Sequence, residues 1–349
     1  MKTLLKEARE LKNLKTREVA QLLGIDQALI SKFESGSRKP TKDQVSKLAT
    51  LLEIDFETIM VSWLKEKIIH EIGQGEFALK ALRAAEEELK LNISPSNNKV
   101  STVLQQLLNE IDIFKAKLNT FSTTETSVIA QALEIEYTHA SNWMEGNSLS
   151  LAETDLVINE GQTISGKSMR EHLEAINHQE AIEFIKNRVK NNASFGEQEI
   201  ISLHTIILRG ILPKEAGHYR SVAITIKDRS FSPCDPIAIS QEIETLFNWY
   251  EQNKNNIHPI ILATTLKERI ITIHPFINGN GKVSRLIMNG VLLQHGYLIA
   301  NIKADNEDRI LYYQTLKAAI TKEKKDDFTL FIAQIEKKSL ERYIKTVSQ

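Results

Sequence analysis

The segment that most constrains the fold of this chain is a glycine-rich run of twelve residues, His274-Pro-Phe-Ile-Asn-Gly-Asn-Gly-Lys-Val-Ser-Arg285. Apolar residues recur at helical spacing before it, from 260 to 271, and again after it, from 283 to 292. This pattern predicts two helices joined by a tight loop at 274–285. The end of one helix and the start of the next must therefore come together at this loop.

The composition of the loop is typical of an anion-binding site. Backbone N–H groups converge in a glycine-rich loop, and the N-terminus of the following helix adds a favourable dipole. Lys282 and Arg285, one helical turn apart, add positive charge for phosphates. His274 at the start of the loop is a candidate proton acceptor near neutral pH. The segment therefore predicts a phosphate site with a base beside it.

Composition limits the kinds of protein that this chain can be. Its 349 residues are enough for two or three domains with hydrophobic cores. The net charge is −1, so any binding of nucleic acid must depend on a locally basic surface. The single cysteine, Cys234, excludes an internal disulfide and a cysteine-based zinc site, and the nine histidines lack the paired spacing of a metal site.

The sequence also predicts where the protein works. The first residues are charged throughout and lack the apolar region of a signal peptide, and no run approaches the roughly 20 apolar residues of a membrane span. A single cysteine fits a reducing compartment. We therefore expect a cytoplasmic protein without a membrane partner.

The spacing of apolar residues predicts a mainly α fold. We expect a compact helical block at 1–60, a helical connector and linker at 61–97, and a second domain at 98–349. The exception to the helical pattern is an alternation of apolar residues at 222, 224 and 226, followed by the turn-like stretch 227–230. It predicts a small β-hairpin within the second domain.

The N-terminal block has the pattern of a helix-turn-helix, in which two short helices meet at 23–26 and the second enters the DNA major groove. The run 16–40 resembles the Cro/repressor-type family in its Ala-x-x-x-Gly core, its Ile-Ser-Lys-x-Glu helix and its Gly-x-Arg-x-Pro exit. That resemblance implies base contacts from Gln27, Ala28, Ser31 and Lys32, while Arg17 stands where the family often has a phosphate-contacting glutamine.

The charge of this block suits DNA, since residues 1–48 hold 11 Lys and Arg against 6 Asp and Glu. The alternative is that the block only packs or dimerises.

The glycine-rich loop resembles the signature of Fic-domain proteins, His-Pro-Phe-x-(Asp/Glu)-Gly-Asn-Gly-Arg-x-x-Arg. In that family the loop binds ATP and magnesium, and the usual reaction transfers AMP to a protein hydroxyl. The resemblance implies that His274 is the catalytic base. It also implies nucleotide contacts from Asn278, Gly279, Asn280, Gly281, Lys282 and Arg285.

Two residues of the loop depart from the family's pattern. Asn278 stands at the metal-ligand position, where an acid is usual, and its amide oxygen can coordinate Mg²⁺ but carries no charge. Lys282 replaces an arginine, so it keeps the charge but lacks the planar fork that grips phosphate with two hydrogen bonds. We therefore expect a weak Mg²⁺ ligand at Asn278 and a weaker or altered activity.

A second segment, 140–153, resembles the family's inhibitory helix, Ser/Thr-x-x-x-Glu-Gly/Asn, which we expect at about 138–146. Ser141 and Glu145 are one turn apart, and Gly146 stops the helix. The resemblance implies that Glu145 pairs with Arg285, displaces the γ-phosphate and leaves ATP unproductively oriented. This inhibition would act within one chain or across a dimer.

Two further features follow from the Fic resemblance. Residues 217–220 and the expected hairpin resemble the family's flap, on which Val222, Ala223 and Ile224 would pair with the backbone of a target segment; the alternative is an ordinary surface hairpin. Tyr312 and Tyr313 fall where family members often contact adenine, although aromatic residues on an apolar helix are more often part of the core.

These features predict a Mg-ATP-dependent protein adenylyltransferase that modifies a Ser, Thr or Tyr hydroxyl of a protein, is inhibited by Glu145 and binds DNA. A homodimer is expected because dimers are common in both families. Three alternatives stay open. They are a repressor whose Fic domain only senses nucleotide, a hydrolase that removes AMP from a protein, and a phosphotransferase that binds ATP in reverse.

Overall fold

The computed structural model describes residues 1–73, 75, 77–83, 85, 100–118, 120–121, 123–226, 231–321 and 324–347. The chain divides into two compact units, Met1–Asn98 and Lys99–Gln349. Residues 86–97, the end of the connector and linker expected at 61–97, lie outside the described residues.

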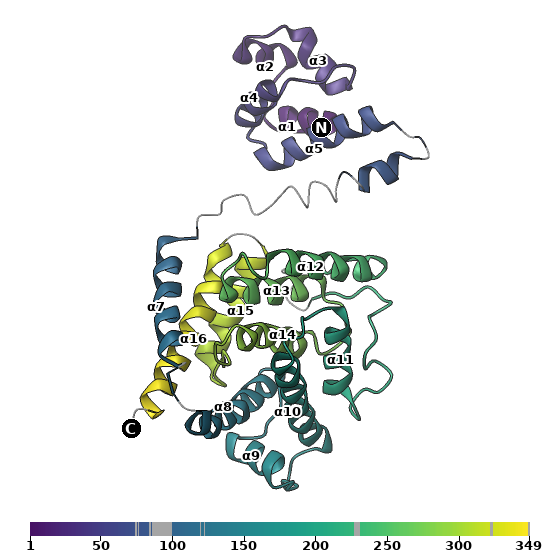
Figure 1. The fold of residues 1–349 in the computed structure, drawn as a ribbon. Helices are drawn as coiled ribbons and strands as arrows, with labels where there is room; N and C mark the ends of the chain where they lie inside the picture. Colours follow the sequence, from purple (N-terminus) through teal and green to yellow (C-terminus); the bar gives the residue numbers. More distant parts are fainter. Residues whose placement is uncertain are drawn as a thin grey trace. The chain divides into compact units, whose positions relative to one another are not determined.

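The N-terminal unit is built from short helices around one apolar core (Figure 1). These helices are α1 (Lys2–Leu11), α2 (Thr16–Leu23), α3 (Gln27–Ser35), α4 (Lys42–Leu52) and α5 (Phe56–Ile72). Gly24 ends α2 with a positive φ of 65°, a conformation that glycine adopts without strain. The Asp26 carboxylate then caps α3 by accepting the backbone N–H of Ala28 at 2.6 Å. The positive φ of Gly24 and the Asp26 cap together define the turn between α2 and α3.

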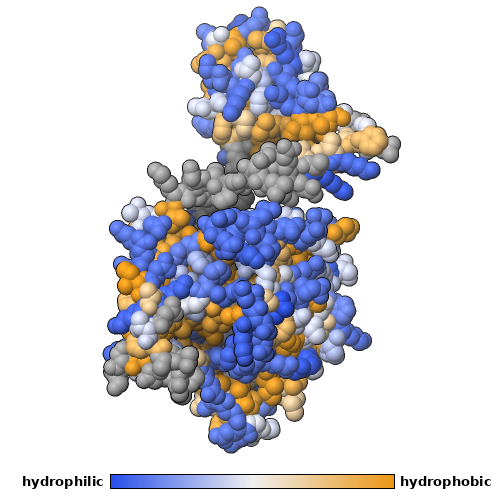
Figure 2. Space-filling model, in the orientation of Figure 1, coloured by the Kyte–Doolittle hydropathy of each residue, from blue (hydrophilic) through white to orange (hydrophobic). Residues whose placement is uncertain are grey.

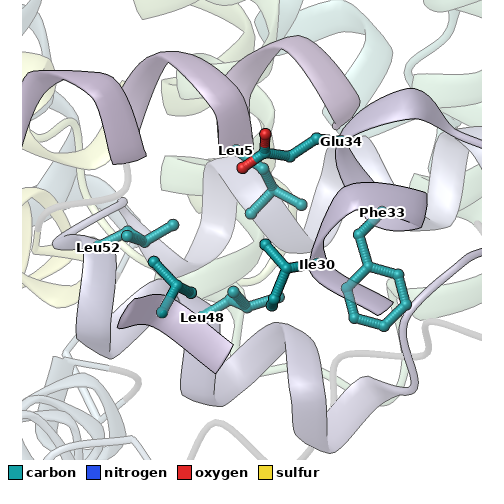
Figure 3. A pocket seen from close by; sticks show the side chains of 7 residues that line it. Leu5, Ile30, Phe33, Glu34, Leu48 and Leu52 are labelled. Carbon is teal, nitrogen blue, oxygen red and sulfur yellow. The ribbon is translucent and has the colours of Figure 1, made fainter. Parts of the chain in front are cut away.

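Figure 3 shows a narrow gap in this core between side chains from α1 to α4. It is lined by Leu5, Val19, Ile30, Phe33, Glu34, Leu48 and Leu52. The one polar lining residue, Glu34, is held by the Arg9 guanidinium, with its two carboxylate oxygens 2.6 and 3.0 Å from Nε and Nη2. Because this carboxylate is already paired and the rest of the lining is apolar, the gap is part of the core packing.

Helix α5 extends this core beyond residue 60. Ile59 and Trp63 are buried in it, and the Trp63 indole donates a hydrogen bond to the Pro40 carbonyl at 2.8 Å. The other side of α5 is apolar and exposed, and Figure 2 shows this hydrophobic surface along the helix. The exposed side chains on it include Val61, Leu64, Ile68 and Ile69.

The second unit is a larger helical assembly (Figure 1). Its helices are α7 (Thr102–Leu118), α8 (Thr123–Trp143), α9 (Leu151–Asn159), α10 (Met169–Lys190), α11 (Glu197–Leu208), α12 (Ile239–Asn253), α13 (Pro259–Ile273), α14 (Asn280–Gln294), α15 (Asn306–Ile320) and α16 (Lys325–Val347), with a 3₁₀ turn at Pro236–Ala238. Helices α13 and α14 pack closely on each other, α10 and α11 lie against α14, and α7 and α15 lie against α16.

Helix α14 lies at the centre of this unit. Nearly all its residues from 280 to 292 are buried, polar ones included, which is the pattern of a helix surrounded on every side. Gly290 lets the Phe195 ring approach its backbone, since an added Cβ would lie only 2.6 Å from that ring. The N-terminus of α14 is therefore held in place by the core of the unit.

The expectation of a mainly α fold is confirmed, but the hairpin is not seen. None of the described residues is in a strand, and 222–226 have no regular secondary structure. A strand needs a partner for its carbonyls, and the Val222 carbonyl is instead bound by the Arg220 guanidinium at 2.9 Å. The turn expected at 227–230 lies outside the described residues. No helix in the described part of the chain is long and apolar enough to span a membrane.

Candidate functional site

The glycine-rich loop connects α13 to α14 and is fixed by its own side chains. Asn280 accepts the backbone N–H of Phe276 at 3.0 Å and donates to the carbonyl of the same residue at 2.8 Å. The Phe276 ring is buried and stacked on the His204 ring, with the ring centres 3.6 Å apart. The Asn280 side chain, expected to contact phosphates, is therefore occupied in holding the loop closed.

The N-terminus of α14 is the anion-binding part of the loop. Gly279 precedes the helix with a φ of 81°, and the first N–H groups of the helix have no acceptor within it. These donors and the helix dipole favour a negative charge at this point. A Cβ added to Gly281 would lie 2.4 Å from Oε1 of Glu145, so the carboxylate of Glu145 comes up against this helix turn.

The same carboxylate is paired with Arg285. The guanidinium, only 2% exposed, donates from Nη2 to Oε1 of Glu145 at 2.9 Å. It also donates to the Ser141 hydroxyl at 3.1 Å and to the Ser141 carbonyl at 3.0 Å. Helix α8 ends at Trp143, and Glu145 stands in the turn beyond it, before Gly146 with its φ of 95°. The structure thus brings Ser141, Glu145 and Arg285 together.

Electrostatics keep this carboxylate ionised. Burial acts to raise the pKa of Glu145, but the charge and hydrogen bond of Arg285 outweigh it, with further help from Lys282 and Lys267. The net result is a pKa below the usual value of 4.5. A negative charge therefore stands at the N-terminus of α14 at neutral pH.

Lys282 is held in the protein interior by a carboxylate that the sequence did not point to. Its side chain is 8% exposed, and Nζ lies 3.6 Å from Oε2 of Glu174 on α10. Asn147 also donates to this oxygen, at 3.0 Å. Burial lowers the pKa of Lys282, and the nearby carboxylates of Glu174 and Glu145 oppose that shift. The cation at 282 is thus shared between the loop and α10.

His274 ends α13 in the left-handed conformation, with a φ of 52°. Its Nδ1 lies 3.3 Å from the Ile271 carbonyl, and because a carbonyl only accepts, Nδ1 carries the proton. Nε2 then has a free lone pair. Burial lowers the pKa of His274, and the Arg220 charge lowers it further, so the imidazole is neutral at pH 7. This is the state that a general base requires.

Arg220 ties the segment after α11 to the loop and was not singled out from the sequence. Its backbone N–H donates to the Pro275 carbonyl at 2.9 Å, and its Nε donates to the His274 carbonyl at 2.8 Å. Nη2 also reaches the Cys234 carbonyl at 2.6 Å. The expected flap residues, Val222, Ala223 and Ile224, come directly after this anchor in the chain, and the Val222 carbonyl accepts from Nη1 of Arg220 at 2.9 Å.

The two tyrosines expected near adenine lie in different environments. Tyr312 is buried, packed edge-on against Phe328, and the Lys267 ammonium lies 4.6 Å from its ring centre. Tyr313 is 44% exposed. Only Tyr313 therefore presents a ring face that a ligand can reach.

Asn278 is exposed at the outer side of the loop. Its side-chain Nδ2 donates to Oε2 of Glu215 at 2.8 Å. Its backbone carbonyl accepts from Nε2 of His204 at 3.0 Å. The described residues contain no group of three His, Cys, Asp or Glu side chains that could hold a metal by themselves. A divalent ion at Asn278 would take most of its other ligands from phosphates and water, which is the usual situation for Mg²⁺.

In the N-terminal unit, the predicted DNA-contacting residues share an exposed surface. Gln27, Ala28, Ser31 and Lys32 are exposed on one face of α3, and Arg17 is exposed on α2. Gln27 is within hydrogen-bond distance of the Thr16 hydroxyl, at 3.3 Å. The face that a helix-turn-helix turns towards the major groove is thus free of core contacts.

Sequence reasoning missed His204, Glu174, Glu215 and Arg220. Each contacts the loop from a segment far away in the chain, and three of them are single polar residues on otherwise ordinary helices or turns. Only Arg220 had a local signal, since it closes the Gly-His-Tyr-Arg run at 217–220.

Two segments of this chain are similar in sequence to known proteins. Residues 194–292 match the family model described as the Fic/DOC family, and residues 5–59 match a helix-turn-helix model. A protein adenylyltransferase Fic of Nematostella vectensis is 28% identical over 250 residues, which are 70% of this chain and 57% of that protein. The protein adenylyltransferase fic-1 of Caenorhabditis elegans is 28% identical over 211 residues, 60% of this chain and 41% of that protein. The chain spans about half the length of the curated relatives it matches.

Solved structures show the same fold. Fic-1 of C. elegans superposes with a TM-score of 0.64 at 21% identity, covering 99% of this chain and 91% of that one. A Fic domain containing signaling protein of Bacteroides thetaiotaomicron gives a TM-score of 0.63 at 24% identity, covering 69% and 97%. Residues 194–292 of this chain are therefore similar to the Fic/DOC family, and residues 5–59 are similar to a helix-turn-helix domain.

Proposed function

We propose that this protein is a protein adenylyltransferase that moves AMP from ATP to a hydroxyl side chain of another protein. The observation that carries the proposal is the meeting of three groups at one loop. They are the N-terminus of α14, the Arg285 guanidinium and the neutral imidazole of His274. The relatives named protein adenylyltransferase support the same activity.

The reaction needs a base and a set of phosphate ligands. Nε2 of His274 takes the proton of the target hydroxyl as its oxygen forms a bond to the α-phosphorus. The bond between the α-phosphorus and the bridging oxygen to the β-phosphorus breaks, and pyrophosphate leaves. The N–H groups of α14 stabilise the phosphate oxygens, and Arg285 and Lys282 neutralise the departing pyrophosphate. A magnesium ion bound with the nucleotide would neutralise further charge, with the Asn278 oxygen among its ligands.

The room for a phosphate comes from Gly281. Its missing side chain leaves the first turn of α14 open, and in this structure Oε1 of Glu145 uses that space. A phosphate oxygen that entered would compete with this carboxylate for the helix N-terminus and for Arg285. We therefore propose that the segment 138–146 inhibits the enzyme through Glu145, with Ser141 keeping Arg285 in position.

The remaining parts of the proposal concern the substrates. We assign the adenine contact to Tyr313 rather than Tyr312, because only Tyr313 is exposed. Residues 222–224 would hold the target segment, since Arg220 fixes their start next to His274. The proposal includes a Ser, Thr or Tyr hydroxyl as the acceptor.

The direct test uses ATP labelled at the α-phosphate with the purified full-length protein. Glu145→Gly should raise self-labelling, and His274→Ala in the Glu145→Gly background should abolish it. Glu160→Gly, an exposed acid at the end of α9, is a matched control that should behave as the unchanged protein. If Glu145→Gly protein takes up no label with Mg²⁺ or Mn²⁺, the proposed activity is wrong.

For the N-terminal unit we propose DNA binding by α3. A gel shift with an upstream fragment of the protein's own gene tests this, and the combined change Gln27→Ala and Lys32→Ala should remove the shift. Absence of any shift at low salt would argue against DNA. A homodimer and a cytoplasmic location complete the proposal, and light scattering and cell fractionation check them.

A nucleotide-sensing repressor is the second candidate. It is favoured by the tie between Lys282 and Glu174, which draws a phosphate-binding cation towards α10. Calorimetry that showed ATP binding without turnover, together with ATP-sensitive DNA binding, would support it over the transferase.

A further inference from the structure

We propose that Glu215 supplies the negative charge that the signature loop lacks at Asn278, so that the magnesium ion of the bound nucleotide is held between these two side chains. This inference rests on the proposed binding of ATP at the loop. It adds a ligand from outside the loop, in the turn that follows α11.

Hydrogen bonds on both sides hold the Glu215 and Asn278 side chains in contact. The Glu215 backbone donates to the Leu212 carbonyl at 3.0 Å, which fixes the turn. On the loop side, the backbone carbonyl of Asn278 accepts from Nε2 of His204 at 3.0 Å. Nδ1 of His204 accepts the backbone N–H of Gly217 at 3.0 Å, so this one ring links the turn to the loop.

The protonation state of this linking ring is fixed. A backbone N–H can only donate, so Nδ1 of His204 is bare and Nε2 carries the proton. The ring itself is fully buried. The spacing between Glu215 and Asn278 is therefore held by a side chain enclosed in the interior of the unit.

The spacing itself suits magnesium. Mg²⁺ binds six oxygens at about 2.0–2.1 Å in an octahedron, which places neighbouring ligands about 2.9 Å apart. Nδ2 of Asn278 and Oε2 of Glu215 are 2.8 Å apart. A half-turn of the amide exchanges its nitrogen for its oxygen at nearly the same point. After that half-turn, two oxygens stand at the separation of adjacent magnesium ligands.

The same geometry explains why an amide is found at 278. A carboxylate there would stand about 3 Å from that of Glu215, and two like charges so close repel unless a cation separates them. The amide instead donates to Glu215 when no metal is bound and presents its oxygen when one is. The pair is thus satisfied in both states, and one net negative charge remains for the ion.

The exposure of the pair leaves room for the other ligands. Asn278 is exposed and Glu215 is half-buried, so water can reach the ion. Mg²⁺ typically takes one or two protein carboxylates together with substrate phosphates and water, which matches this donor set.

The test measures binding rather than turnover. The Glu145→Gly protein is titrated by calorimetry with α,β-methylene-ATP, first with Mg²⁺ and then with EDTA. The same pair of titrations is run after adding Glu215→Gln, which keeps the size and the hydrogen-bond acceptor and removes only the charge. Glu160→Gln serves as the matched control on a remote exposed acid.

We expect Mg²⁺ to tighten binding in the Glu145→Gly protein and in the Glu160→Gln control. In the Glu215→Gln protein that tightening should shrink by about tenfold or more, while the affinity in EDTA stays within about twofold. Adding Asn278→Asp to the Glu215→Gln protein should restore the Mg²⁺ effect, because the charge returns to the other side of the ion.

An undiminished Mg²⁺ effect in the Glu215→Gln protein would overturn the inference. So would an equal loss of affinity in Mg²⁺ and in EDTA, because the residue would then have a structural role only. If the Glu145→Gly protein bound the analogue equally with and without Mg²⁺, this inference would fail while the proposed ATP site stood. Failure of every variant to bind the analogue would overturn both.

Discussion

Replacing Glu145 with alanine should change protein stability and nucleotide affinity by related amounts. The carboxylate pairs with a guanidinium that is 2% exposed, while the Glu145 side chain itself is 37% exposed. Exposed ion pairs contribute roughly 0–1 kcal/mol and hydrogen bonds to charged groups about 1.5–3 kcal/mol. For a pair with one buried and one partly hydrated partner, we expect about 1–2 kcal/mol. Arg285 keeps its contacts to Ser141 in the variant.

The same free energy opposes nucleotide binding, because a phosphate must displace the carboxylate from Arg285 and from the start of α14. Removing the Glu145 carboxylate should therefore tighten the binding of an ATP analogue. Since 1.4 kcal/mol corresponds to a factor of ten, about 1–2 kcal/mol corresponds to about 5- to 30-fold. Urea unfolding should show a loss of about 1–2 kcal/mol in the same variant.

Calorimetry measures the nucleotide affinity and urea unfolding measures the free energy of unfolding, each for Glu145→Ala and for Glu160→Ala. The Glu160 variant, changed at an exposed position directly after α9, should match the unchanged protein in both stability and affinity. Lower stability with an unchanged nucleotide affinity would refute the reasoning, because the carboxylate and the phosphate would then occupy different places.

Three further predictions follow from buried polar groups. Because burial lowers the pKa of His274 and the base must be neutral, the acid limb of the transfer rate should lie below pH 6.5 in a pH–rate profile. Burial raises the pKa of Glu336 from the ordinary 4.5 to about 8. The proton bound in the folded state therefore contributes to the free energy of unfolding in full below about pH 4.5, and this contribution is lost as the pH rises to about 8. Urea unfolding at several pH values should show that Glu336→Gln abolishes this loss. Asn280→Ala leaves the N–H and carbonyl of Phe276 without partners, and calorimetric unfolding should show a loss of about 2–4 kcal/mol.

Local rules predicted much of the helical structure. Gly24 and Asp26 define the turn between α2 and α3, and the glycines of the signature loop define the break between α13 and α14. These features depend on residues within a few positions of one another. The mainly α fold follows from them, together with the apolar spacing of the helices.

Contacts between distant segments were beyond these rules. Glu174 and Glu215 meet the loop only because α10 and the turn after α11 fold against it, and nothing in their neighbouring residues marks them. The meeting of Glu145 with Arg285 was predicted from the family resemblance and not from spacing. The separate environments of Tyr312 and Tyr313 depend on which side of α15 faces the core.

The hairpin prediction failed for a related reason. Alternating apolar residues describe the preference of one segment, whereas a strand also needs a neighbour that accepts and donates in register. Here the Arg220 side chain donates a hydrogen bond to the Val222 carbonyl. A side chain only two residues away therefore binds a carbonyl that a neighbouring strand would need, which the alternation of apolar residues does not reveal.

The bare Cα of Gly281 has a consequence for how such a protein responds to its surroundings. A Cβ at this position would lie 2.4 Å from Oε1 of Glu145, so in the proposed mechanism the carboxylate and a ligand oxygen compete for the same place. A tethered competitor has a constant effective concentration, whereas that of a free ligand varies with the state of the cell. Under the proposed inhibition, the ligand concentration at half-occupancy therefore rises with the strength of this single ion pair, which sets the range of ligand levels to which the protein responds.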